Sequence, residues 1–345
     1  MHSQSLKCVD NISFFDIKVC FSSYIVGFGD SNTNFTNCTM LRGPLGKKTY
    51  KPKFSGHDTF PFRYAWLTKI VNYLEKGGIK KIKEFEKNKL QTMSEFGVGL
   101  NMVKSIRHWS IVTRVCDRDF NITDFGKLLF SKKDSLDPYL ERHETLWLLH
   151  WMLASDENLT TWFYVFNYHP SILLNREHLT NELISIGRFS KWKGISPNTI
   201  KRDVDCFVRT YSISSKKGEI TEDSIECPLA ELGIIQPTFN KNEFEIQKGP
   251  KATLSPDIFT FALNDYFSSQ ANQIITFEKL MYDFGSPGRV FALDEASMEN
   301  YLELMEKAKN KLFQFDRGAG GLRQITKIKN SSSAQLIKNC YKKVA

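Results

Sequence analysis

The sequence predicts a mainly helical α+β protein, with winged helix-turn-helix lobes, a buried helical core and a small C-terminal α+β lobe. Residues 100–111 and 196–211 both carry apolar side chains at helical spacing and follow turn or cap signals. Residues 146–153 are apolar almost all round, which is typical of a buried helix. Because single hydrophobic cores rarely serve a chain of 345 residues, we expect several domains.

The first segment is a leader without helical periodicity, rich in Phe, Ser and Asn, over residues 1–46. We expect Met40 to be the true start, so that residues 1–39 are untranslated or disordered; the alternative is a short accessory β segment. The later regions are expected to be a winged-helix DNA-binding domain (54–135), a helical core with a second helix-turn-helix (136–215), a C-terminal α+β region (216–328) and a basic, disordered tail (329–345).

A first helix is expected soon after residue 54. Ser55 or Asp58 is a suitable N-cap, and Pro61 would then lie in the first turn. Gly77 and Gly78 predict its end. Its buried stripe would be Tyr64, Leu67, Val71 and Leu74.

Residues 92–130 predict a DNA-binding winged helix. Residues 92–96 end one helix, the glycine-rich residues 97–99 form a turn, and residues 100–111 form the next helix. Its apolar side contains Met102, Val103, Ile106 and Trp109. Its opposite side contains Asn101, Lys104, Ser105 and His108, and Arg107 lies on the flank of that side. A recognition helix needs this division, because one side packs on its domain while donors reach phosphates and bases.

A wing strand is expected within residues 121–129, where it would lead into a capped helix. The alternative interpretation of residues 92–130 is a small helical subdomain with a solvated basic face.

The middle of the chain is expected to be structural, with buried helices at 146–153 and 162–166. His143 and His150 lie seven residues apart and therefore on one helical face. Without a nearby third ligand, we expect hydrogen-bonded core or boundary residues rather than metal ligands.

A second helix-turn-helix is expected where Ser196 caps a helix that begins at Pro197, with residues 176–186 as the supporting helix. The buried stripe would be Ile200, Val204, Phe207, Val208 and Tyr211. The opposite, polar side would contain Asn198, Arg202, Asp205 and Arg209. The candidate DNA contacts of this helix are Asn198, Lys201, Arg202 and Arg209. The alternative is a packing helix whose Arg and Asp residues pair with each other.

The C-terminal third contains a glycine-rich loop at residues 285–289, placed between a helix and a strand at 290–293. Arg289 in that loop could contact a phosphate, although a structural turn is favoured. An amphipathic helix is expected over residues 294–311.

The net charge of +9 favours a polyanionic partner. Residues 76–114 contain nine basic and three acidic residues, so the excess is concentrated around the first expected reader. No membrane span and no signal peptide is recognisable. The seven cysteines are scattered without metal-ligand spacing, which fits reduced thiols in the cytoplasm.

The motif Gly-His-Asp-Thr-Phe at residues 56–60, followed by Arg63-Tyr64, resembles the opening of a bacterial domain-of-unknown-function family. That family is found beside DNA phosphorothioation genes and includes the nicking B subunit of single-strand phosphorothioation systems. Further matching blocks lie at 97–107, 137–140, 145–151, 201–205, 227–233 and 285–291, with a closing hairpin at 317–324. One departure is Asp58, where the family usually has Glu.

The resemblance implies a DNA-binding protein of a phosphorothioate modification and defence system, acting as a metal-dependent nicking subunit. It also implies double-stranded DNA, a sulfur-transfer protein of the ATP-pyrophosphatase type, a cysteine desulfurase and an ATPase as partners. The alternatives are a non-catalytic DNA-recognition subunit and a winged-helix transcriptional regulator.

Nicking by metal-assisted hydrolysis would need carboxylates for Mg²⁺ or Mn²⁺, a base and a cation near the phosphate. Three candidate groups are His57, Asp58 and Arg63; Asp203 and Asp205 beside Lys201 and Arg202; and the acidic run Glu219, Glu222, Asp223 and Glu226. Their structural alternatives are a helix cap, intrahelical salt bridges and solvated loop acids.

Overall fold

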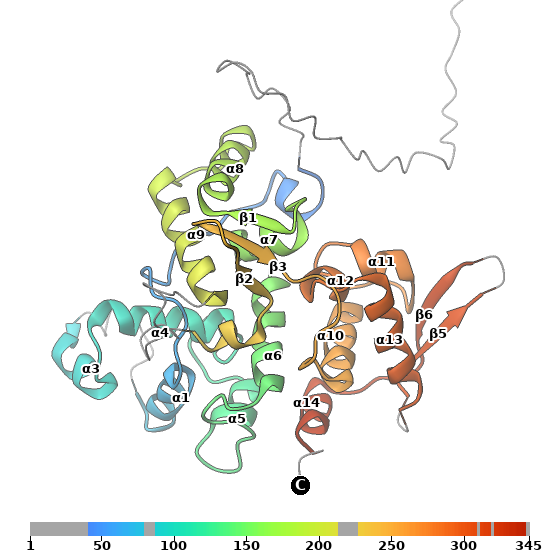
Figure 1. Ribbon diagram of the computed structural model, residues 1–345. Coiled ribbons are helices and arrows are strands. Elements are labelled where there is room, and N and C mark those ends of the chain that lie inside the picture. The colour runs from blue at the N-terminus through green and yellow to red at the C-terminus, as the bar shows by residue number, and fades with distance from the viewer. Residues whose placement is uncertain (1–40, 79–86, 213–226, 309–310, 319–320, 343–345) are drawn as a thin grey trace, which may run out of the picture. The chain divides into compact units, whose positions relative to one another are not determined.

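The computed structural model describes residues 41–78, 87–212, 227–308, 311–318 and 321–342 (Figure 1). These residues belong to one compact unit, Thr39–Ala345, and form the expected mixture of helices and small antiparallel sheets. The described chain begins with a short 3-10 helix, η1 (Pro44–Gly46), in which Leu45 is buried. The backbone of Leu45 donates to the Tyr168 hydroxyl, so residues 41–46, predicted to belong to the leader, pack against the folded chain.

The N-terminal helices are α1 (Trp66–Glu75), α3 (Lys89–Phe96), α4 (Leu100–Val112) and α5 (Asp124–Phe130). The helix-turn-helix formed by α3 and α4 confirms the predicted helices and turn, with Gly97 at φ 63° ending α3. Val103, Ile106 and Trp109 are buried as expected. Ser105, predicted on the exposed face, is also buried, because the segment around Phe60 covers it and its hydroxyl donates to the Phe60 carbonyl.

Two predictions for this region are wrong. The first helix begins at Trp66 rather than near Pro61, since residues 56–59 form a turn with positive φ angles and no side-chain cap. The wing strand within 121–129 is reduced to an isolated bridge between Cys116 and Ile122. The capped helix that should follow it is present, because Thr123 accepts from the Gly126 amide at the start of α5.

The helices α6 (His143–Ala154) and α7 (Thr160–Asn167) confirm the predicted buried core. Every residue of α6 from Thr145 onward is buried. His150 accepts a hydrogen bond from the Tyr211 hydroxyl at Nδ1 and donates from Nε2 to the Val290 carbonyl, both at 2.8 Å. Burial lowers the pKa of His150 to about 4, so it is a neutral, fully hydrogen-bonded core residue at neutral pH.

A first β-lobe follows α7 and packs three short strands with two helices. Its elements are β1 (Leu173–Asn175), α8 (Arg176–Phe189), α9 (Pro197–Tyr211), η3 (Pro228–Leu232), β2 (Ile235–Pro237) and β3 (Glu243–Ile246). Ser196 caps α9 as predicted, by accepting from the Thr199 amide. The antiparallel sheet has the order β1-β3-β2.

A second β-lobe repeats this arrangement further along the chain. Its elements are α10 (Pro256–Ser268), β4 (Ile274–Thr276), α11 (Phe277–Tyr282), α12 (Pro287–Val290), α13 (Glu295–Glu306), β5 (Phe313–Arg317) and β6 (Arg323–Lys327). Its sheet order, β4-β6-β5, again places the last strand in the middle. In both lobes the last residue of the first strand, Asn175 or Thr276, caps the helix that follows directly.

The C-terminal region corrects two further expectations. The strand predicted at 290–293 is absent from the described residues, because Ser286 caps the short helix α12 and the chain then turns, with the Leu293 amide bonded to the Gly288 carbonyl. The tail beyond residue 329, expected to be disordered, contains α14 (Ser333–Tyr341). Its buried residues, Leu336, Ile337 and Cys340, belong to the hydrophobic core. The hairpin of β5 and β6 is present as expected.

Candidate nucleic-acid interface

A strained turn at residues 56–59 precedes α1. Gly56, Asp58 and Thr59 have φ angles of 120°, 43° and 68°, which non-glycine residues rarely adopt. Gly56 is also required sterically, because a Cβ there would lie 2.3 Å from Nδ1 of His108 on α4. The turn therefore lies directly against the helix that the sequence predicted to contact DNA.

A buried histidine anchors this turn to α9. His57 donates from Nε2 to Oδ1 of Asp203 at 2.8 Å, while its Nδ1 accepts from the Thr59 amide at 3.1 Å. The second carboxylate oxygen of Asp203 accepts from the Thr161 hydroxyl at 2.5 Å. Both His57 and Asp203 are only 3% exposed, so their hydrogen bonds hold the turn from the buried side.

Arg209, predicted to contact DNA, also supports the turn. Its guanidinium donates to the Thr59 carbonyl at 3.0 Å. The sequence placed His57, Asp203 and Arg209 in separate groups, and the fold brings them together around residues 56–59.

A basic groove of about 740 Å³ lies between this turn and the outer side of α4. We call it the α4 groove. Its charged lining residues are Lys53, Asp58, Lys104, Arg107, Arg114, Asp117, Arg118 and Asp156. Five of these are cations and three are carboxylates, so the groove has a net positive charge, which favours an anion such as a DNA backbone.

Asp58 is exposed in this groove and lies within the strained turn at residues 56–59. The anchoring of its neighbours His57 and Thr59 fixes the backbone from which its carboxylate projects. The predicted catalytic carboxylate and the predicted DNA-binding residues Lys104 and Arg107 therefore share one groove.

Burial changes the chemistry of two α4 residues. The Arg107 guanidinium lies 4.8 Å from the centre of the Phe120 ring, and burial lowers its pKa, although an arginine stays charged at neutral pH. Burial, with the charge of Lys53 nearby, lowers the pKa of His108 to about 3. His108 is consequently neutral at physiological pH, and the positive charge of the groove comes from lysine and arginine.

Other predicted residues lie elsewhere. Asn101 is exposed on α4, and Asn198, Lys201 and Arg202 are exposed near the start of α9. Arg63 is half-buried before α1, outside the lining of the α4 groove.

The remaining candidates are Arg289 and the acidic run. Burial lowers the pKa of Arg289, whose Nε donates to the Tyr282 carbonyl at 3.3 Å, and it lines a separate cavity of about 140 Å³. Asp223 and Glu226, with Glu219 and Glu222, lie outside the described residues.

Sequence reasoning missed five charged groove residues, Lys53, Arg114, Asp117, Arg118 and Asp156. Lys53 borders the expected domain 54–135 and Arg114 ends the basic stretch 76–114, so the local excess of positive charge was the signal that could have indicated them. Asp156 follows α6 and carries no motif; its position depends on how α6 packs.

The described residues contain no group of three His, Cys, Asp or Glu side chains that could together hold a metal ion. The described carboxylates of the α4 groove therefore do not form a metal centre by themselves. Within the described part of the chain, no helix is long and apolar enough to cross a membrane.

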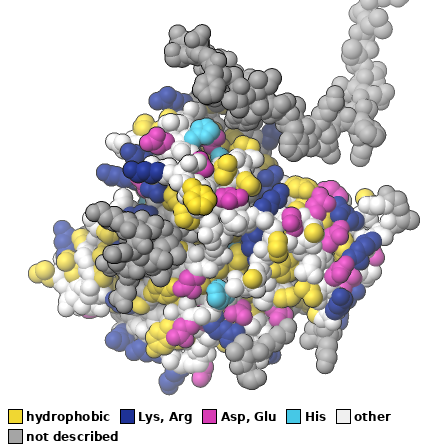
Figure 2. All heavy atoms as spheres, in the orientation of Figure 1, with side chains coloured by type: hydrophobic (Ala, Val, Ile, Leu, Met, Phe, Trp, Pro, Cys, Tyr) yellow, Lys and Arg dark blue, Asp and Glu magenta, His cyan; other side chains and the backbone are white. Residues whose placement is uncertain are grey.

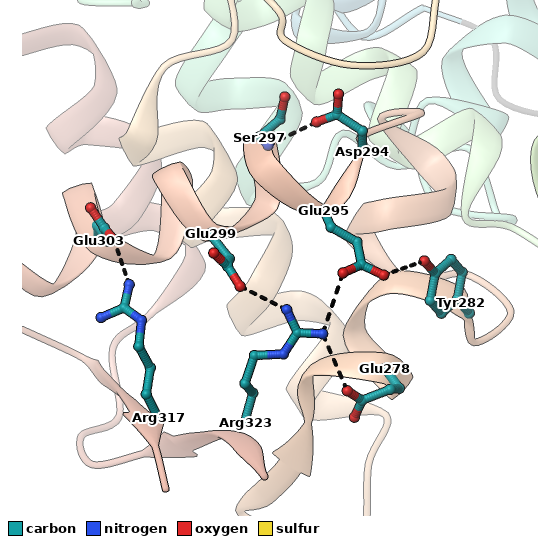
Figure 3. Close-up of polar contacts among 9 residues, drawn as sticks. All are labelled: Glu278, Tyr282, Asp294, Glu295, Ser297, Glu299, Glu303, Arg317 and Arg323. Carbon is teal, nitrogen blue, oxygen red and sulfur yellow. Dashed lines mark hydrogen bonds and ion pairs between the residues drawn. The ribbon is translucent and has the colours of Figure 1, made fainter. Parts of the chain in front are cut away.

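The second β-lobe presents a different surface. Figure 3 shows Arg323 of β6 within reach of three glutamates, with its closest contact at 2.7 Å to Glu299. Arg317 of β5 pairs with Glu303 in the same way. Acidic and basic side chains accordingly alternate over this lobe in Figure 2, and side chains of both signs also lie over α8 and α9 of the first β-lobe. The acidic side of α13 is therefore neutralised by its own hairpin.

The family model described as "Protein of unknown function (DUF4007)" matches residues 54–341. The chain belongs to the DUF4007 family. Two solved structures are similar to this DUF4007 protein: one described as magnesium ion-bound SspB (TM-score 0.68, 27% identity) and one as SspB (TM-score 0.67, 26% identity). Each match covers 84% of this chain and 87% of the other. No curated protein sequence gives a significant match.

The matched span begins just before the turn at residues 56–59 and includes both β-lobes. It therefore contains every element that builds the α4 groove except Lys53. The match confirms the family resemblance inferred from the sequence motifs.

The His57–Asp203 anchor leads to a stability prediction. Asp203→Ala should lower the free energy of unfolding by about 1–3 kcal/mol, because it leaves the buried His57 and Thr161 donors without their acceptor. Urea denaturation of both proteins measures this difference.

Asp205→Ala is the matched control, two residues further along α9. Asp205 pairs with Arg176 at 3.1 Å on a partly exposed face, so its loss should cost about 1 kcal/mol or less. Equal losses for the two variants would contradict the anchoring role of Asp203.

Proposed function

We propose that this DUF4007 protein is the DNA-binding subunit of a DNA phosphorothioation system and that it contacts DNA through the α4 groove. The observation that carries the proposal is the gathering of five cations and the anchored 56–59 turn in one groove along the second helix of a helix-turn-helix. The similarity to SspB structures and the resemblance to the phosphorothioation-associated family support the biological setting.

The arrangement of the first β-lobe supports a second DNA contact. Two helices between strands, followed by a hairpin whose last strand lies between the other two, is the arrangement of a winged helix. Lys201 and Arg202 are exposed on α9, which would be its recognition helix. We propose that α4 and α9 contact the same duplex. The resemblance supplies the other partners: a sulfur-transfer protein, a cysteine desulfurase and an ATPase.

The salt dependence of DNA binding tests the α4 groove. Lys104→Gln with Arg107→Gln removes two positive charges and keeps most of the aliphatic stems. We expect weaker binding and a slope of log K against log salt that is flatter by up to about 2, since each phosphate contact contributes about 0.9. Fluorescence anisotropy with duplex DNA at several salt concentrations measures both quantities.

Lys132→Gln with Lys133→Gln removes the same charge from an exposed loop outside the groove and is the matched control. It should change the slope little. A groove variant with the slope of the unmodified protein would remove α4 from the interface.

Nicking is the second candidate function, and the exposed carboxylate of Asp58 in the groove favours it. A carboxylate held beside a bound phosphate backbone can accept a proton from an attacking water. The relative described as magnesium ion-bound SspB makes Mg²⁺ the first cation to supply in an assay. Because the described residues hold no three-ligand group, we propose Asp58 as the reacting group without assigning a metal site.

Plasmid relaxation tests the nicking proposal. Supercoiled DNA should be converted to open circles in the presence of Mg²⁺, and Asp58→Asn should lower this rate at least tenfold while DNA binding persists. The control is Asp58→Glu, which restores the residue usual in the resembled family and should retain activity. Bound but uncut plasmid with the unmodified protein would leave a DNA-recognition subunit without nuclease activity.

A further inference from the structure

A single aromatic ring projects from the tip of the hairpin that joins β2 and β3. Phe239 is fully exposed, in a chain whose other aromatic side chains mostly fill the core. Phe189, at the end of α8, is only 46% exposed. A fully exposed ring contributes no apolar burial to the fold and stays accessible to a ligand.

The hairpin tip is braced, so the ring is presented on an ordered turn. The Thr238 amide donates to the Glu243 carbonyl at 3.0 Å. The Glu243 carboxylate accepts from the Thr238 hydroxyl at 3.1 Å and from the Asn240 side-chain amide at 3.2 Å. A preformed turn reduces the ordering cost that a flexible loop would incur on binding.

Hydrogen bonds join this tip to the start of α8 and, through Arg176, to α9. The Asn242 carbonyl accepts from the Arg176 amide at 3.1 Å, and the Arg176 guanidinium pairs with Asp205 on α9 at 3.1 Å. The exposed Lys201 and Arg202 lie about one helical turn before Asp205. Arg176 therefore links the hairpin tip to the part of α9 that carries Lys201 and Arg202.

The residues around the ring indicate whether its ligand is a protein or a nucleobase. The tip residues that follow Phe239 are Asn240, Lys241 and Asn242, and the carboxylate of the next residue, Glu243, is bonded to Thr238 and Asn240. A protein hot spot is normally enclosed by further contacts that exclude water. The exposed Ile172 and Leu173 do not supply them, because the register places Leu173 opposite Glu245, at the other end of the hairpin. A nucleobase needs only a ring to stack on and cations nearby for its phosphate.

The charged surface of the second β-lobe differs from that of the first. Its corresponding helix, α13, has its acidic side paired with Arg317 and Arg323 of its own hairpin (Figure 3). The first β-lobe instead combines exposed cations with an exposed ring, which is the combination that nucleic-acid binding requires.

We propose that Phe239 is a base-stacking wedge, which inserts against a nucleobase while α9 holds the adjacent backbone. Apolar side chains used in this way unstack a base step and kink the duplex. This inference rests on the proposed DNA-binding function and adds a residue that neither the sequence motifs nor the α4 groove indicates.

Duplex DNA with 2-aminopurine placed at successive positions tests the wedge, because the fluorescence of this base reports its stacking. The unmodified protein should change the signal strongly at one or two positions. Phe239→Ala should abolish that change and weaken binding about tenfold, whereas Phe239→Trp should preserve both. Phe189→Ala, the matched exposed phenylalanine, should behave as the unmodified protein.

A second set of oligonucleotides, in which the reporter lies unpaired opposite a gap, shows whether Phe239 stacks on a paired or on an unpaired base. A signal in the intact duplex means insertion between paired bases and supports the wedge, whereas a signal only at the gap means stacking on an already unpaired base and contradicts insertion into the duplex. If Phe239→Ala binds and reports as the unmodified protein does, the wedge is wrong and DNA binding stands. If the unmodified protein does not bind DNA, both proposals fail.

Discussion

The buried hydrogen bond between His57 and Asp203 is the constraint on which the α4 groove depends. It joins a turn with three positive φ angles to a helix 146 residues later in the chain. Backbone strain of this kind persists only when the surroundings hold it, and here Thr161 and Arg209 complete the support. The result is an exposed carboxylate, Asp58, at a fixed place among cations.

The two β-lobes show how one arrangement of helices and strands can present opposite electrostatics. In the first, α9 exposes Lys201 and Arg202, and its hairpin exposes a ring. In the second, Arg323 contacts Glu278, Glu295 and Glu299, so that the lobe neutralises its own helix. Fold alone therefore does not assign DNA binding to a lobe; the charged side chains of each surface do.

Local signals in the sequence predicted local structure well. The Ser196 cap, the glycine turn at 97–99 and the all-apolar segment within α6 each depend on neighbours within one or two helical turns. The turn at 56–59 could not be predicted, because its conformation is set by Asp203 and its glycine by His108. The predicted exposure of Ser105 was wrong for the same reason: a helical wheel places its side chain outside, but a segment distant in sequence packs over it.

Protection of lysines from acetylation by bound DNA tests the α4 groove most directly. Lys53 and Lys104 line the groove, while the exposed Lys329 and Lys338 near the C-terminus do not line it. The account predicts that duplex DNA slows acetylation of the first pair, measured by mass spectrometry, and leaves the second pair unchanged. Unchanged reactivity of Lys53 and Lys104 in a DNA complex would contradict it.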